Sequence, residues 1–225
     1  MKNKELYKNQ GWVHIKNIIP TETISNIRER AIKLRYWVND KVGKPSKFGE
    51  PLHWNGLGCA GMYDDYLLDF YKSNTMVTIA KELLETDDVW MYNDQIVVKL
   101  PSDDFKFEAH TDNSVGGNSS QGKNTINLCV ILDDFTDENG TLQIKDKKIY
   151  PKAGDIVGIH GDTLHQSEPN KSDKPRCLYA CVYSDEKIEF ENFYKQPITK
   201  SFIWKLRDLI YQEIGLILQY ITFHI

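Results

Sequence analysis

Three residues of this sequence carry side chains that commonly bind metal ions, and their spacing suggests a single site. His110 and Asp112 lie two residues apart in His110-Thr111-Asp112, and His165 follows 53 residues after Asp112. In a strand, residues i and i+2 project from the same face with their Cα atoms roughly 6.6 Å apart. Two imidazoles and one carboxylate on one side of an ion leave three coordination positions open, as in non-haem Fe(II) sites. We therefore expect these three residues to bind a metal.

A basic residue strengthens this expectation, because Arg176 stands 11 residues after His165. A turn over residues 168–175 predicts a hairpin that returns the Arg176 strand beside His165. An arginine that points into a barrel is costly unless an anion meets it, and a carboxylate fits the guanidinium through two hydrogen bonds. His160 is the other candidate for the distal ligand, but its position and the spacing to Arg176 favour His165.

The segments that must position this site are predicted to be short strands. From Val89 to Lys99 the residues alternate, with Gln95 and Lys99 on one face. The other face, with Trp90, Tyr92, Ile96 and Val98, is apolar enough to be covered by helices, so the first should line a barrel interior. Residues 125–133 alternate likewise. Further strands are predicted at 141–144, 148–150, 155–160 and 176–183, the last with Arg176, Leu178, Ala180 and Val182 facing inward. Strands at this spacing indicate a sandwich or barrel.

Residues 1–225 are predicted to form one domain with helical ends. Within residues 1–88, we expect a strand at 12–19, a helix from residue 20, a long loop at 43–66 and a helix at 75–84. Residues 89–185 form the barrel core. Residues 186–225 form an extension whose amphipathic helix, from residue 197, should pack on the barrel exterior. The last dozen residues are apolar nearly all round, so a homodimer contact through this helix is the alternative.

Composition restricts the classes of partner. The chain has 40% hydrophobic and 27% charged residues and a net charge of -4, so no general attraction to nucleic acid is expected. The polar N-terminus does not resemble a signal peptide, and no membrane span is predicted. If Cys177 and Cys181 share one strand, their Cα atoms lie roughly 13 Å apart, too far for a disulfide. We expect a reduced, cytoplasmic protein.

The stretch from about Gly11 to Val182 resembles the phytanoyl-CoA dioxygenase family of Fe(II)/2-oxoglutarate oxygenases. The resemblance is carried by GWVHIKNIIP, by QIVVKLP followed by HTD, and by NGTLQI followed by AGDIVGIHGDTLHQSEPNKSDKPR. It implies a mainly β fold with flanking helices, the double-stranded β-helix (jelly-roll, cupin-like) barrel. It also implies that His110, Asp112 and His165 hold Fe(II). Arg176 and Ser167 would bind 2-oxoglutarate, with Lys99 and Asn127 lining its pocket, and Gln95 shares the predicted face of Lys99.

The resemblance further implies a dioxygenase that uses O₂ to hydroxylate a small-molecule substrate and releases succinate and CO₂. The loop at 48–66 and the segment 113–124 are the expected places for substrate contacts. One alternative is a prolyl-hydroxylase-like oxygenase acting on a peptidyl or free amino acid, although such relatives typically carry lysine in place of Arg176. Another is a non-catalytic barrel that binds a metal or ligand. The sequence also departs from the family, since Lys145 to Lys148 (KDKK) replace the Gly-Ser-His that usually follows Asn-Gly-x-Leu.

Overall fold

The computed structural model describes residues 2–42, 56–58, 60–101, 104–114 and 122–188. The C-terminal helix expected from residue 197, and the homodimer contact proposed through it, lie outside these residues. So do most of the loop expected at 43–66 and residues 115–121 of the segment expected to contact substrate. Among the helices described, none combines the length and the apolar character that a membrane span requires.

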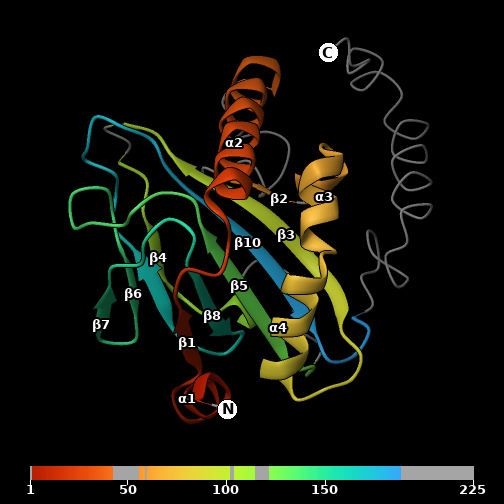
Figure 1. Ribbon diagram of the computed structural model, residues 1–225. Coiled ribbons are helices and arrows are strands. Elements are labelled where there is room, and N and C mark those ends of the chain that lie inside the picture. The colour runs from red at the N-terminus through yellow and green to blue at the C-terminus, as the bar shows by residue number, and fades with distance from the viewer. Residues whose placement is uncertain (1, 43–55, 59, 102–103, 115–121, 189–225) are drawn as a thin grey trace.

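Two antiparallel sheets form the body of the protein (Figure 1). The six-stranded sheet has the order β1 (Trp12–Ile15), β8 (Ile156–His160), β5 (Thr125–Ile131), β10 (Arg176–Ser184), β3 (Trp90–Lys99) and β2 (Gly56–Gly58). The four-stranded sheet has the order β4 (Phe107–His110), β9 (His165–Ser167), β6 (Leu142–Ile144) and β7 (Lys147–Ile149). From β3 onward the chain passes repeatedly from one sheet to the other, apart from the β6–β7 hairpin within the smaller sheet. This arrangement is the double-stranded β-helix predicted from the sequence.

Helices cover one face of the larger sheet. Figure 1 shows α2 (Thr21–Val42), α3 (Asp65–Tyr71) and α4 (Asn74–Leu84) on this face, with α1 (Lys2–Gln10) beside β1. Ile27 and Met76 of these helices pack on Ile96 and Leu128 of the sheet, and all four side chains are fully buried. A separate apolar cluster, which includes Val97, lies between the two sheets. The larger sheet is therefore covered on both faces, by helices on one and by the smaller sheet on the other.

The predicted helices at residues 20 and 75 and the strands of the barrel are present, with ends that differ by a few residues. The helices α1 and α3 were not predicted, because both are short and lie in polar or aromatic segments without a long apolar period. α3 is stabilised at its start by Asp64, whose carboxylate accepts hydrogen bonds from the Tyr66 and Leu67 backbone N–H groups.

A β-bulge interrupts the alternation along β3. Asn93 is opposite Val182 and Met91 is opposite Tyr183, so Tyr92 is an additional residue in the register. Met91 packs against the helix-side cluster, whereas Tyr92 packs with Val182 and Ile188. The prediction that Tyr92 lies on the helix-covered face is therefore wrong, because the bulge shifts the alternation by one residue.

The side chain of Tyr71, from α3, reaches this bulge. Its hydroxyl accepts a hydrogen bond from the Tyr92 backbone N–H at 3.2 Å and donates to the Asn93 carbonyl at 2.8 Å, with the Val182 carbonyl also in contact. Backbone groups that the bulge removes from the strand ladder thus find a partner in the helix layer.

Candidate functional site

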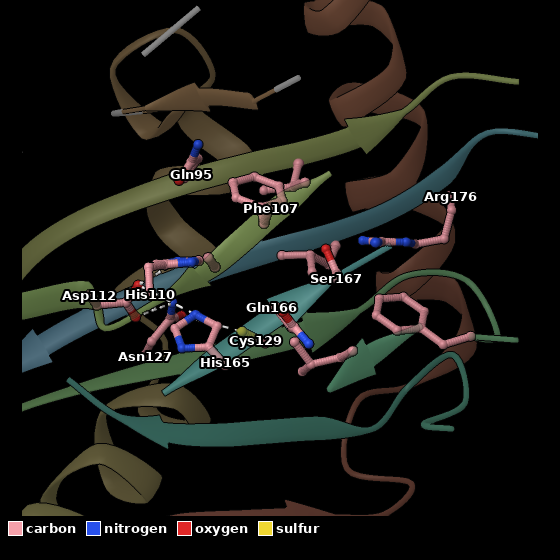
Figure 2. A pocket seen from close by; sticks show the side chains of 15 residues that line it. Gln95, Phe107, His110, Asp112, Asn127, Cys129, His165, Gln166, Ser167 and Arg176 are labelled. Carbon is pink, nitrogen blue, oxygen red and sulfur yellow. Dashed lines mark hydrogen bonds and ion pairs between the residues drawn. The ribbon is translucent and has the colours of Figure 1, made fainter. Parts of the chain in front are cut away.

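The three predicted ligand side chains meet between the two sheets (Figure 2). His110 ends β4, His165 begins β9, and these two residues are directly paired in the smaller sheet. Oδ1 of Asp112 lies 3.7 Å from Nε2 of His110 and 3.6 Å from Nε2 of His165. One nitrogen or oxygen from each residue lies within 4.8 Å of the other two, so a single ion fits between them.

Asp112 does not lie in a strand, and the expectation of two ligands on one strand is wrong. β4 ends at His110, and Asp112 begins the 3₁₀ turn η3 (Asp112–Ser114). The Ser114 backbone N–H closes the turn on the Thr111 carbonyl at 3.1 Å. The two side chains still share one point because the chain bends between them.

Hydrogen bonds behind the ligands orient both imidazoles. Nδ1 of His110 lies 2.6 Å from the Glu108 carbonyl and Nδ1 of His165 lies 2.9 Å from the Thr163 carbonyl. A carbonyl only accepts, so each Nδ1 carries the proton and each Nε2 offers its lone pair to an ion. Burial and the neighbouring His165 lower the pKa of His110, which favours the neutral, ligating form.

The carboxylate is oriented in the same way. Asp112 Oδ2 accepts a hydrogen bond from Asn127 Nδ2 at 3.0 Å, while Oδ1 is the oxygen nearest both histidines. Two imidazole nitrogens and one carboxylate oxygen, each oriented by a second contact, suit Fe(II) with three positions left for other ligands.

Arg176 lies at the other end of the same pocket and is 1% exposed. Its guanidinium donates to the Gly140 carbonyl at 2.8 Å and lies 4.3 Å from the centre of the Phe135 ring. Burial lowers the pKa of Arg176 to about 10, which still leaves the group charged near neutral pH. Within the described part of the chain, no carboxylate forms an ion pair with it.

Lys99 is a second buried cation at this end, opposite Arg176 in the register of β3 and β10. Its Nζ donates to Ser167 Oγ at 2.8 Å and also contacts the Ser167 and Glu168 carbonyls. Ser167 lines the pocket, whereas Lys99 stands behind it. Two buried cations side by side favour an anion between them and the metal ligands.

The predicted hairpin between His165 and Arg176 is absent. β9 pairs with β4 and β6, whereas β10 pairs with β3 and β5. Residues 168–175 therefore cross from one sheet to the other. His165 and Arg176 still face one pocket, from opposite sheets rather than from neighbouring strands.

The pocket encloses about 530 Å³ of space, including the part open to solvent. Of the residues named from the sequence, it is lined by Gln95, His110, Asp112, Asn127, His165, Ser167 and Arg176. The predicted inward faces also included Val97, Leu178 and Ala180, and Cys129 lies two residues after Asn127 on the same strand. Sequence reasoning missed four lining residues that lie in a loop or in strands of three or four residues, where no alternation can be read: Phe107, Phe135, Leu142 and Gln166.

His160 and His14 make hydrogen bonds away from the three metal-binding side chains. Nε2 of His160 lies 2.9 Å from Asn124 Oδ1, outside the group of metal-binding side chains. Nε2 of His14 lies 2.7 Å from Asp155 Oδ2, where it joins β1 to the start of β8. His53 and His224 lie outside the described residues.

Comparisons with solved structures show proteins of similar fold. The fold is similar to that of the non-haem α-ketoglutarate-dependent epimerase SnoN from nogalamycin biosynthesis, with a TM-score of 0.67, 16% identity, and coverage of 88% of this chain and 92% of that one. EctD from S. alaskensis with bound Fe gives a TM-score of 0.67 at 14% identity, over 81% and 75% of the two chains. EvdO2 from Micromonospora carbonacea var. aurantiaca, complexed with 2-oxoglutarate, gives 0.65 at 16% identity, over 89% and 95%.

These likenesses concern the fold, and no curated protein shows a significant match. The family comparison is more specific. Residues 7–145 match the family described as phytanoyl-CoA dioxygenase (PhyH), a range that includes His110 and Asp112 and ends before His165 and Arg176. This match covers more than half of the chain, and the chain therefore belongs to the phytanoyl-CoA dioxygenase family.

Proposed function

We propose that residues 1–225 form a single-domain Fe(II)- and 2-oxoglutarate-dependent dioxygenase that hydroxylates a small-molecule substrate. One observation carries this proposal. A facial set of two histidines and one aspartate, and a buried arginine without an acidic ion-pair partner among the described residues, line opposite ends of one pocket. A dicarboxylate that chelates a metal at one end and pairs with a cation at the other fits that arrangement.

The residues divide into two groups by role. His110, Asp112 and His165 would hold Fe(II), with Asn127 fixing the carboxylate of Asp112. Arg176 would bind the far carboxylate of 2-oxoglutarate, Ser167 would donate to it, and Lys99 would orient Ser167 and add positive charge. The amide of Gln95 lines the pocket wall on the Lys99 strand, where it can bind co-substrate or substrate.

When bound, iron(II) and 2-oxoglutarate supply the activation of O₂, with one oxygen atom passing to the substrate and the other to succinate as CO₂ leaves. The protein holds the ligands on one side of the ion and so reserves the other positions for these molecules. Apolar side chains such as Phe107, Leu142 and Leu178 exclude water around them.

The first test needs no knowledge of the substrate. Fe(II) and then 2-oxoglutarate are added to the protein without oxygen, and the visible charge-transfer band of the chelated complex is recorded. We expect the band to require both additions and to be absent from His110→Ala. A protein that binds Fe(II) but develops no band with 2-oxoglutarate would contradict the proposal.

The second test identifies the reaction. Candidate small molecules are screened by succinate release in the presence of O₂, and the product of each active compound is analysed by mass. We expect a gain of one oxygen atom. A product of unchanged mass, or one that has lost two hydrogen atoms, would indicate epimerisation or ring closure, the activities named for SnoN and for the carbocyclase SnoK. Activity on a prolyl peptide but on no small molecule would favour the prolyl-hydroxylase-like alternative.

A further inference from the structure

The distance between Asp112 and His165 depends on two segments that are far apart in the sequence. Strand pairing joins His110 directly to His165, but Asp112 lies in η3, outside the strands. His165 follows a turn, residues 161–163, that connects β8 to β9. Asn127 orients the Asp112 carboxylate, whereas contacts between η3 and this turn fix the backbone of Asp112 relative to that of His165.

Asn113, the residue after Asp112, makes these contacts. Its backbone N–H donates to the Gly161 carbonyl at 3.0 Å, and its Nδ2 donates to Asp162 Oδ1 at 2.7 Å. Its Oδ1 accepts a hydrogen bond from Thr125 Oγ1 at 2.8 Å, and Thr125 is 1% exposed. One residue thus joins η3 to the turn and to the first residue of β5.

The turn is in turn connected to the His165 ring. The Thr163 carbonyl accepts from Nδ1 of His165 at 2.9 Å, and the Thr163 hydroxyl donates to the Gly11 carbonyl at 2.9 Å. A shift of the turn relative to η3 would therefore carry the imidazole with it.

Gly161 provides the space that this arrangement needs. A Cβ at position 161 would lie 2.0 Å from Thr125 Oγ1 and 2.4 Å from Asn113 Oδ1. Both distances are far shorter than any van der Waals contact, and the first of these atoms belongs to a buried side chain. A side chain at position 161 cannot coexist with the Thr125–Asn113 hydrogen bond.

We propose that Asn113 is a positioning residue that sets the separation of Asp112 and His165 for the metal, with Gly161 as the residue that leaves it room. The proposal rests on the assignment of these two residues as Fe(II) ligands. Asn113 itself does not coordinate the ion; it acts through the backbone of η3 and through the turn.

The test compares Fe(II) affinity, by anaerobic calorimetry, in the wild type and in Asn113→Ala. We expect the dissociation constant to rise about tenfold or more, the range usual for residues that support metal ligands. We also expect the charge-transfer band with 2-oxoglutarate to shift, because the Asp112 carboxylate changes position. Asp155→Ala is the control, since Asp155 accepts from the Asn17 and Lys152 backbone N–H groups at the opposite end of β8. It should lower the melting temperature and leave Fe(II) affinity unchanged.

A paired exchange separates positioning from charge. Asn113→Asp alone places two carboxylates against each other at positions 113 and 162. The double variant Asn113→Asp/Asp162→Asn restores a donor between them and keeps an acceptor for Thr125. Simple attraction predicts that the double variant binds Fe(II) more weakly than Asn113→Asp, because it has one negative charge fewer. Positioning predicts the reverse order.

Gly161→Ala provides an independent check without removing any polar group. We expect Gly161→Ala to weaken Fe(II) binding as Asn113→Ala does. Its melting temperature should be no lower than that of Asp155→Ala, so a general loss of stability would not explain the weaker binding. Wild-type affinity in both Asn113→Ala and Gly161→Ala would overturn the proposal. A wild-type protein that binds no Fe(II) at all would instead overturn the assignment of the metal ligands, so the two failures are distinguishable.

Discussion

The two faces of the six-stranded sheet differ sharply although the same strands supply both. On β3, Ile96 and Val98 pack under the helices, whereas Gln95 and Lys99 point toward the space between the sheets. On β10, Tyr179 lies under the helices and Arg176 lines the pocket. The helix-covered face is filled with apolar and aromatic groups, while the other face contains buried cations and amides. The comparison indicates that one face supplies stability and the other supplies binding.

The largest expected effect is on the binding face. His165→Ala removes one of three donors to the metal, so Fe(II) binding and Fe(II)-dependent succinate release should both be lost. The free energy of unfolding, from a urea titration without metal, should change much less, because the ring lines the pocket and takes no part in the apolar cluster under the helices. Retention of Fe(II) binding by His165→Ala would contradict its role as a ligand.

The opposite result is expected on the helix-covered face. Ile96→Ala leaves a cavity beneath the helices and should lower the free energy of unfolding by about 2–5 kcal/mol. Below the melting temperature, the affinity of this variant for 2-oxoglutarate, measured with Fe(II) present, should equal that of the wild type. A variant that loses co-substrate affinity while still folded would show that the two faces are not separable.

Asp94 is the exception on the helix-covered face, since its carboxyl is buried there and accepts hydrogen bonds from the Tyr179 hydroxyl at 2.6 Å and the Gly61 backbone N–H at 2.7 Å. Burial raises the pKa of Asp94 to about 6, against an ordinary value of 3.8. Well below pH 4 the group is protonated in both the folded and the unfolded state. As the pH rises toward 6 it ionises first in the unfolded chain, so the folded state loses about 3 kcal/mol of relative stability.

Asp94→Asn should remove this loss. Urea titrations at several pH values should show the variant gaining stability relative to the wild type between pH 4 and 6, and a constant difference above that range. A difference that does not depend on pH would mean that the pKa of Asp94 is the same in the folded and unfolded states.

The smallest of these effects concerns the anion end of the pocket. Arg176→Ala removes hydrogen bonds to a charged group, worth about 1.5–3 kcal/mol, so the affinity for 2-oxoglutarate should fall roughly tenfold or more. Fe(II) affinity should be unchanged, because Arg176 lies at the end of the pocket away from the metal ligands. Unchanged co-substrate affinity would refute the role assigned to Arg176.

The sequence predicted this division well where strands alternate regularly and poorly elsewhere. The inward positions of β10, and the meeting of His110, Asp112 and His165, followed from a period of two and from ligand chemistry. The turn η3 could not be foreseen, because a strand and a bend after His110 can both place the side chains of His110 and Asp112 on the same side of the chain. The crossing from β9 to β10 was missed because a segment of eight residues can either close a hairpin or pass between sheets. The contacts of Asn113 with Gly161 and Asp162 could not be predicted, because no local sequence pattern shows that these segments lie close together.

The Tyr71 hydroxyl in the bulge of β3 makes the helix layer a determinant of which face of the sheet the first side chains of β3 occupy. Because that one oxygen compensates the Tyr92 N–H and the Asn93 carbonyl, the strand can carry one residue more than its partner. Loss of the oxygen, as in Tyr71→Phe, would favour a regular strand in which the side chains of Trp90 to Tyr92 move to the opposite face of the sheet. A substitution in a helix that contacts neither metal nor co-substrate would then change which side chains of β3 face the space between the sheets.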